Sequence, residues 1–251
     1  MVHIVGAGPG DPELLTVKGQ CYLAAADVVI YAGSLVNPAL LGVCKPTAEI
    51  HDSAQLTLDE VLAIMAQAEA AGKMTVRLHT GDPAVYGAIQ EQMDALRARG
   101  IAYDVVPGVS SCFAAAASLR QELTLPGVTQ TVIITRGAGR TAVPERERLR
   151  ALAAHGATMC IFLSISFLAD VVAELQAGGY AADTPIAVVQ RASWPDEKTV
   201  RGTLADICPQ VQAAGIDRQA MIIVSPCLGA EYELSRLYAP EFSHMFRQGQ
   251  A

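Results

Sequence analysis

The stretch Val5-Gly6-Ala7-Gly8-Pro9-Gly10-Asp11 is a glycine-rich turn between an apolar segment and the start of a helical pattern. A strand, a glycine turn and a helix are typical of nucleotide-binding α/β domains, in which a pyrophosphate contacts the helix N-terminus. Here, however, Asp11 stands where a dinucleotide fingerprint has its third glycine, and Pro9 lacks a backbone N–H. The turn therefore favours a neutral or cationic ligand over an anionic one.

The composition is that of a packed globular protein. The chain has 251 residues, of which 51% are hydrophobic and 17% are charged, and its formal net charge is −7. This length supports one large domain or two small ones, and the negative charge disfavours binding to nucleic acid or to an anionic membrane. No apolar run reaches the roughly 18 residues of a membrane span, and Met1 leads straight into the first predicted strand, without a signal peptide. We expect a cytoplasmic protein.

The six cysteines are scattered, without a CxxC or a Cys/His spacing. This pattern predicts reduced core residues and no metal site. The cysteines are Cys21, Cys44, Cys112, Cys160, Cys208 and Cys227.

Short apolar strands alternate with helical patterns, which predicts an α/β fold with mainly parallel sheets. Helices are expected at 57–71, where Thr57 and Glu60 form a capping box, at 88–99, at 145–155 and in the small-residue run after Gly108. Strands are expected at 2–5, 27–31, 48–51, 74–79, 102–106, 130–135, 158–163, 185–191 and 220–225. A loop at 122–127 precedes a new series of strands and helices, so we place two α/β lobes at 1–114 and 115–251 with a cofactor cleft between them.

The turns after the strands are the expected location of the site, because ligands in such folds lie at the carboxyl ends of the strands. Small residues, hydroxyl groups and carboxylates recur there. Examples are Thr80-Gly81-Asp82-Pro83, Pro107-Gly108-Val109-Ser110-Ser111 and Ser193-Trp194-Pro195-Asp196. Each turn alone fits ordinary helix initiation, since Asp82 can cap a helix and Pro83 suits its first turn. Their coincidence indicates a single cleft.

In their order, these motifs resemble those of the tetrapyrrole (uroporphyrin-III/precorrin) methylases, over residues 2–226. The matching stretches are Val5–Gly10 with Leu14–Gly19, His79–Pro83, Val106–Ser111 and Trp194–Lys198. Other segments most resemble the members that methylate carbon 11 of precorrin-4 in cobalamin (vitamin B12) biosynthesis. These segments are Tyr31–Val36, Leu78–Ile89, Ser235–Tyr238 and Phe242–His244.

The resemblance implies methyl transfer from S-adenosyl-L-methionine, which leaves as S-adenosyl-L-homocysteine, to a small-molecule tetrapyrrole, without a metal and in a homodimer. The donor carries a positive sulfonium and no phosphate, which agrees with a turn that contains Pro9 and Asp11. The implied cofactor contacts, mostly through backbone groups, are Pro9, Thr80, Gly81, Asp82, Val85, Ser110, Ser111, Leu163, Ala192 and Met221.

Three residues are candidates for catalysis, each with a structural alternative. Asp11 either faces the substrate or stabilises a helix N-terminus. His79 either contacts the substrate or only ends a strand. Tyr86 fits a packing role at least as well as a catalytic one. A cationic group is the candidate for binding substrate carboxylates, because guanidinium groups pair with carboxylates through two hydrogen bonds. Its members are Arg136, Arg140, Arg191 and Lys198, with Arg201; taken singly, each fits a solvated surface charge better.

Several alternatives stay open. One is a methylase of another macrocycle position or a diphthine synthase. Another is an NAD-dependent oxidoreductase on a Rossmann sheet, which Pro9 and Asp11 disfavour. A third is a noncatalytic cofactor-sensing protein. The choice between a metal-free and a cobalt-containing precorrin also stays open, as does the identity of any general base.

Overall fold

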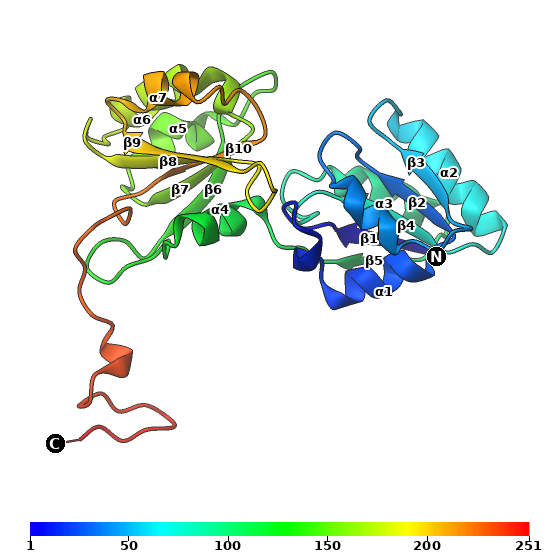
Figure 1. Cartoon of the computed structure of the whole chain (residues 1–251), viewed down its shortest axis with the longest axis horizontal. Coiled ribbons are helices and arrows are strands. Elements are labelled where there is room, and N and C mark those ends of the chain that lie inside the picture. The colour runs from blue at the N-terminus through cyan, green and yellow to red at the C-terminus, as the bar shows by residue number, and fades with distance from the viewer. Residues whose placement is uncertain (251) are drawn as a thin grey trace. The chain divides into compact units, whose positions relative to one another are not determined.

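The computed structural model describes residues 1–250 and divides the chain into two compact units, each built on a five-stranded sheet (Figure 1). Unit 1 comprises Met1–Ser118 and Arg191–Glu197, and unit 2 comprises Leu119–Gln190 and the residues from Lys198 onward. The expected α/β class is confirmed, since five of the eight strand pairings within residues 1–250 are parallel. The residue expected to end the first lobe, Ala114, lies inside α4 (Ser111–Leu119).

Unit 1 contains a parallel sheet with the strand order β3-β2-β4-β1-β5. Its strands are β1 (Val2–Gly6), β2 (Val28–Tyr31), β3 (Glu49–Asp52), β4 (Thr75–His79) and β5 (Tyr103–Val106). Besides α4, its helices are η1 (Pro12–Leu14), α1 (Val17–Ala25), η2 (Pro38–Val43), α2 (Leu58–Ala70) and α3 (Ile89–Ala98). The parallel order brings the carboxyl ends of β4, β1 and β5 to one edge.

The central strand β1 is buried on both faces, which explains its continuous apolar sequence. Alternate side chains of a strand point to opposite faces. Ile4 therefore packs with Met65 of α2 and Leu96 of α3, whereas Val5 packs on the other face with Leu23 of α1. These contacts fix β1 and hence the position of the glycine turn that follows it.

Unit 2 contains a mixed sheet with the strand order β6-β7-β10-β8-β9. Only β6 and β7 pair in parallel within the part of unit 2 that the structure describes. The strands are β6 (Val132–Arg136), β7 (Thr158–Phe162), β8 (Pro185–Gln190), β9 (Lys198–Thr203) and β10 (Ala220–Val224). The helices are η3 (Glu145–Glu147), α5 (Leu149–Ala153), η4 (Ile165–Phe167), α6 (Leu168–Ala177), α7 (Ile207–Ala213) and η5 (Arg236–Tyr238).

Two elements differ from the sequence expectation. The strand β9 was missed, because it is a largely exposed edge strand whose one large apolar residue is Val200. The helix expected at 145–155 is divided into η3 and α5, because Arg148 between them has an extended backbone with ψ of 147°.

The expected state of the cysteines holds in part. Within residues 1–250 no pair forms a disulfide, and Cys112, Cys160 and Cys227 are buried. Cys21, however, is exposed on α1, because it lies away from the apolar side of that helix. Across the same residues, no helix is both long enough and apolar enough to cross a membrane.

The capping box at the start of α2 offers a test of the local sequence reading. Thr57 Oγ1 accepts a hydrogen bond from the Glu60 amide at 3.3 Å, and the Glu60 carboxylate accepts one from the Thr57 amide at 2.7 Å. Thr57→Ala is expected to lower the free energy of unfolding by about 1 kcal/mol, measured by urea denaturation with circular dichroism. Thr57→Ser keeps the acceptor and should retain most of the stability; an equal loss in both variants would contradict the capping role.

Candidate functional site

Three loops that follow parallel strands meet in unit 1, after β1, β4 and β5. Gly8 and Gly81 exchange two backbone hydrogen bonds, at 3.3 and 2.8 Å. A Cβ atom on Gly108 would lie 2.2 Å from the Gly81 carbonyl oxygen, and one on Gly6 would lie 2.6 Å from the Gly108 nitrogen. Real Cβ atoms do not approach so closely, so the loops touch through backbone atoms and require glycine at positions 6 and 108. We call these loops the three-loop cluster.

The backbone amides of the turn after β1 are largely occupied within unit 1. The amides of Ala7, Gly8 and Asp11 donate at 2.7, 3.3 and 3.0 Å, and Pro9 has no N–H. Their acceptors are the His79 and Gly81 carbonyls and the Ser193 hydroxyl. A phosphate cradle needs several amides directed at the ligand. This turn is therefore built as a packing element rather than as an anion site.

Asp82 connects two of the three loops. Its Oδ1 accepts from the Ala84 amide at 2.8 Å, and its Oδ2 accepts from the Gly108 amide at 3.0 Å. Of the two roles considered for Asp82, helix capping is wrong, because the residues after it form a turn and α3 begins at Ile89. Its carboxylate instead holds the β5 loop against the β4 loop.

A segment distant in sequence supports the β1 turn. The Trp194 indole donates to the Pro9 carbonyl at 2.8 Å, and a Cβ on Gly10 would lie 2.0 Å from its Nε1. The Arg191 guanidinium lies 3.9 Å from the Trp194 ring centre and donates to Asp196 at 2.8 Å. Trp194 was part of a recognised motif, but its role in supporting the β1 turn was missed, because the glycine that it covers, Gly10, is distant in sequence.

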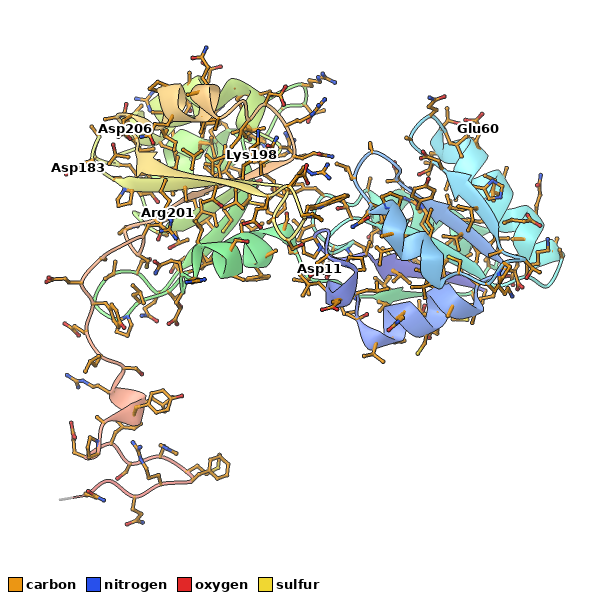
Figure 2. All side chains as sticks on the ribbon, in the orientation of Figure 1. Asp11, Glu60, Asp183, Lys198, Arg201 and Asp206 are labelled. Atoms are coloured by element: carbon orange, nitrogen blue, oxygen red, sulfur yellow. The ribbon has the colours of Figure 1, made fainter. Side chains whose placement is uncertain are left out.

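Two of the catalytic candidates have clear structural roles. Asp11 caps η1, where its carboxylate accepts from the Glu13 amide at 2.9 Å (Figure 2). Tyr86 is 46% exposed and has a φ of +56°, a left-handed conformation that costs a non-glycine residue energy. Such a conformation is retained only where the surroundings fix it, which here is the turn between Asp82 and α3.

His79, the last residue of β4, is buried and neutral. Its Nε2 has no hydrogen-bond partner within the described residues. Burial, together with the positive charge of Arg77, lowers the pKa of His79 to about 3. Arg77 is itself buried, where it donates to the Ile30 carbonyl and to Gln92. The imidazole at this strand end is therefore uncharged at neutral pH.

The expected cofactor residues fall into both units. Pro9, Thr80, Gly81, Asp82, Val85, Ser110, Ser111 and Ala192 all belong to unit 1. A Cβ on Gly81 would lie 3.8 Å from Ser110 Cα and from the Ser111 nitrogen, so these residues adjoin the three-loop cluster. Leu163 and Met221 belong to unit 2, where Leu163 is 67% exposed with a φ of +55° and Met221 is buried in β10.

Most of the cationic candidates already have protein partners. Arg136 donates to three carbonyls of its own loop, and Arg191 pairs with Asp196. On β9 (Figure 2), Lys198 donates to the Ala214 carbonyl and Arg201 to the Leu119 carbonyl. Arg140 is the exception, since its side chain has no hydrogen bond or ion pair within residues 1–250. Within that same range, no group of three His, Cys, Asp or Glu residues could hold a metal ion.

Residues 1–208 match the family model described as Tetrapyrrole (Corrin/Porphyrin) Methylases, and the chain belongs to this family. It is 56% identical over 248 residues to a cobalt-precorrin-4 C(11)-methyltransferase of Methanocaldococcus jannaschii, a match that covers 98% of this chain and 96% of the relative. It is 48% identical over 250 residues to a precorrin-4 C(11)-methyltransferase of Pseudomonas aeruginosa, covering 99% of each. The resemblance read from the sequence is confirmed.

Solved structures of methyltransferases are similar to this chain as well. The structure of a cobalt precorrin-4 methyltransferase superposes with a TM-score of 0.89 at 49% identity, covering 91% of this chain and 96% of the other. A uroporphyrin-III C-methyl transferase from Thermus thermophilus, complexed with S-adenyl homocysteine, superposes with a TM-score of 0.75 at 30% identity, covering 90% and 98%. The fold described above is therefore that of the family.

The neutral state of His79 has a consequence for stability. The unfolded chain protonates this imidazole near its ordinary pKa of 6.5, whereas the folded chain does so only near pH 3. Stability should therefore fall as the pH falls through this window, by up to about 1.4 kcal/mol per pH unit from this residue. Urea denaturation of the wild type and of His79→Leu between pH 7 and 4 should show a shallower pH dependence in the variant.

The exposed His155 provides a matched control. His155→Leu should keep the pH dependence of the wild type. Equal slopes in the wild type and His79→Leu would contradict the lowered pKa of His79, because a residue whose pKa is the same in both states adds no pH dependence.

Proposed function

We propose that the chain is an S-adenosyl-L-methionine-dependent methyltransferase that methylates carbon 11 of precorrin-4 in cobalamin biosynthesis. The observation that carries the proposal is its similarity, over nearly its whole length, to C(11)-methyltransferases. A methylase of another macrocycle position is disfavoured, because the uroporphyrin-III methylase is the more distant neighbour in both identity and superposition.

The three-loop cluster suits this donor. The amides of Ala7, Gly8, Asp11 and Gly108 donate to protein acceptors, and the turns after β1 and β4 carry the carboxylates of Asp11 and Asp82. A pyrophosphate would meet negative charge without an amide cradle, which disfavours the NAD-dependent alternative. A sulfonium meets no such penalty, and the relative complexed with S-adenyl homocysteine supports the same donor class. Thr80, Gly81, Ser110 and Ala192 of unit 1 would contact the donor.

When bound, S-adenosyl-L-methionine supplies an electrophilic methyl group, and the substrate supplies a nucleophilic ring carbon. The residues of this chain then have to position the methyl group, orient the target carbon and exclude water, and orientation alone can supply a large part of a rate enhancement. The neutral His79 and the capping Asp11 serve the shape of the cluster in this account.

The proposal also covers the oligomeric state of the chain, its cellular compartment and its binding partners. The chain acts as a homodimer in the cytoplasm, on a small-molecule tetrapyrrole, without a metal of its own and without nucleic acid or membrane. Its net charge of −7 supports the last two exclusions, because both surfaces are anionic. Analytical ultracentrifugation tests the dimer, and a sedimentation coefficient of a monomer would reject it.

The activity is tested by turnover. The enzyme is supplied with S-adenosyl-L-methionine and with precorrin-4 or cobalt-precorrin-4 in parallel, since relatives with either name are similar to it. We expect a product with one added methyl group by mass spectrometry, located on carbon 11 by NMR. A methyl group at another carbon, or no product from either substrate, would reject the proposed function.

The role of Asp82 is tested by cofactor binding. Asp82→Ala leaves the Gly108 amide without its carboxylate partner, a charge-assisted hydrogen bond. Its loss should loosen the β5 loop and raise the Kd of S-adenosyl-L-homocysteine by about tenfold, measured by calorimetry. Gly108→Ala, whose Cβ would lie 2.2 Å from the Gly81 carbonyl oxygen, should act in the same direction.

Asp94→Ala removes an exposed carboxylate from α3 and serves as the matched control. It should leave the Kd unchanged. An unchanged Kd in Asp82→Ala as well would mean that the three-loop cluster does not form the cofactor site.

A further inference from the structure

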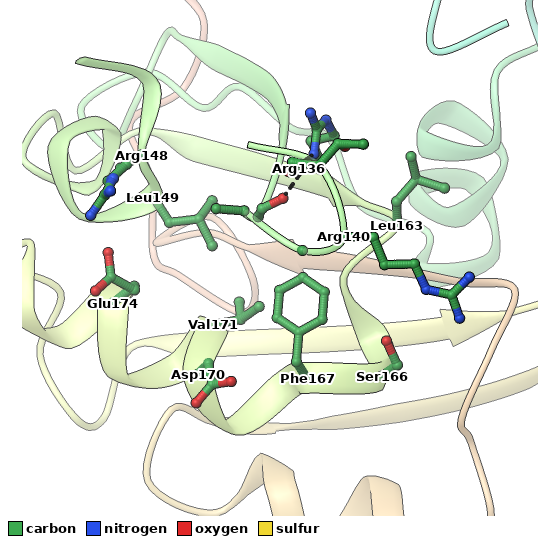
Figure 3. A pocket seen from close by; sticks show the side chains of 14 residues that line it. Arg136, Arg140, Arg148, Leu149, Leu163, Ser166, Phe167, Asp170, Val171 and Glu174 are labelled. Atoms are coloured by element: carbon green, nitrogen blue, oxygen red, sulfur yellow. Dashed lines mark hydrogen bonds between the residues drawn. The ribbon is translucent and has the colours of Figure 1, made fainter. Parts of the chain in front are cut away.

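A cavity of about 830 Å³ lies entirely within unit 2 (Figure 3). Its walls are the loop 137–141 after β6, Leu163 at the end of β7, the residues Ser166 and Phe167, and the first turns of α6. The volume falls in the range of about 300–1,000 Å³ that small-molecule sites occupy. The cavity also lies at the carboxyl ends of the parallel pair β6 and β7, where ligands of α/β sheets bind.

The loop that forms one wall is held in place by a specific network. The Arg136 guanidinium donates to the carbonyls of Gly137, Thr141 and Ala142 at 3.3, 3.1 and 2.8 Å, so it closes the loop on itself. The Gly137 amide donates at 2.8 Å to the hydroxyl of Ser164, which is fully buried. Arg136 is therefore occupied by its own loop.

Glycine lets this loop lie against an aromatic ring. A Cβ on Gly137 would lie 2.7 Å from the Phe167 ring, and one on Gly139 would lie 3.1 Å from it. The loop thus packs on Phe167 through backbone atoms, and Figure 3 shows the ring in the middle of the cavity wall. The exposed Leu163 adds a second apolar surface.

The charges divide the cavity into two ends (Figure 3). At one end Arg148 lies with Asp170 and Glu174, and Arg148 is already paired with Glu145. At the other end Arg140 lies beside Leu163, and its guanidinium has no hydrogen bond or ion pair among residues 1–250. Among the described residues that line the cavity, Arg140 therefore offers a guanidinium with no protein partner next to an apolar surface.

We propose that this cavity receives one edge of the tetrapyrrole substrate, with a carboxylate side arm paired to Arg140 and the ring edge against Leu163 and Phe167. This inference rests on the proposed function, because it takes the substrate class from it. A carboxylate accepts two parallel hydrogen bonds from a guanidinium, which fixes both distance and orientation. Arg136 is a positioning residue, since it sets the loop that carries Arg140. The acidic end disfavours a second carboxylate and so orients the substrate edge.

A carboxylate could also come from the methionine part of the methyl donor, and the experiment separates the two sources. Arg140→Ala and Arg140→Lys are compared with Arg218→Ala, which removes an exposed, Asp217-paired guanidinium of unit 2 outside the cavity. Turnover gives KM and kcat for the tetrapyrrole, and calorimetry gives the Kd of S-adenosyl-L-homocysteine.

We expect Arg140→Ala to raise KM for the tetrapyrrole by at least about tenfold, with kcat reduced less and with the S-adenosyl-L-homocysteine Kd within about twofold of the wild type. Arg140→Lys should recover part of the loss, and Arg218→Ala should behave as the wild type. A raised S-adenosyl-L-homocysteine Kd, or an unchanged KM, in Arg140→Ala would overturn the proposal.

Arg136→Ala tests the positioning role. It should raise KM when Arg140 is present but add little in the Arg140→Ala background, since the two act through the same contact. Fully additive effects would overturn this role.

A failure of the proposed function is distinguishable from a failure of this inference. If the wild type forms no product, the substrate class is tested directly with uroporphyrin III, a stable tetrapyrrole with carboxylate side arms, by titration of its fluorescence. Binding that is lost in Arg140→Ala and kept in Arg218→Ala supports the cavity assignment, and equal binding in both overturns it.

Discussion

The candidate site of unit 1 depends on one steric constraint, the approach of three loops to distances at which no Cβ fits. Gly6 and Gly108 let the ends of β1, β4 and β5 meet through backbone atoms, and Gly81 supplies the carbonyl that a Cβ on Gly108 would strike. The sheet order makes this possible, because β1 lies between β4 and β5. Any larger residue at positions 6 or 108 would force the loops apart. The other features, including the carboxylate of Asp82 and the indole of Trp194, maintain an arrangement that the glycines permit.

This constraint has an electrostatic consequence. In a phosphate-binding loop, glycines allow the ligand to approach backbone amides. Here they allow one loop to approach another, and the Ala7, Gly8 and Asp11 amides of the β1 turn donate to protein acceptors. The turn thus resembles a nucleotide-binding loop in sequence, but its glycines serve the packing of loops rather than the binding of phosphate. In the proposed function, this turn would present backbone and small side chains to a donor without phosphate, whose charge is positive.

Much of the fold could be predicted from the sequence, because it follows from local patterns. The apolar strands of unit 1 and the capping box at Thr57 are signals that each segment carries by itself. The edge strand β9 could not be predicted, because its residues are mostly polar and Val200 is its one large apolar residue, so the sequence carries no apolar period. The family motifs identified the residues of the three-loop cluster, but the motifs did not explain why glycine is required at positions 6 and 108.

The roles of several site residues could not be predicted from the sequence, because these roles depend on contacts between distant segments. Trp194 covers Gly10 across more than 180 positions of sequence, and nothing in either segment predicts the other. The cationic candidates looked alike in sequence, yet the guanidinium of Arg136 donates three hydrogen bonds to its own loop, whereas that of Arg140 has no hydrogen bond or ion pair within residues 1–250. Only the structure distinguishes Arg136, which positions its loop, from Arg140, which is proposed to bind the substrate carboxylate.

The central claim, that the three-loop cluster is built for a donor without phosphate, is tested most directly by competition between two cofactors. Calorimetry would follow binding of S-adenosyl-L-homocysteine to the full chain in the absence and presence of excess NAD. The account predicts the same Kd in both titrations and no heat from NAD alone. Displacement of S-adenosyl-L-homocysteine by NAD would contradict it, because the β1 turn would then accept a pyrophosphate.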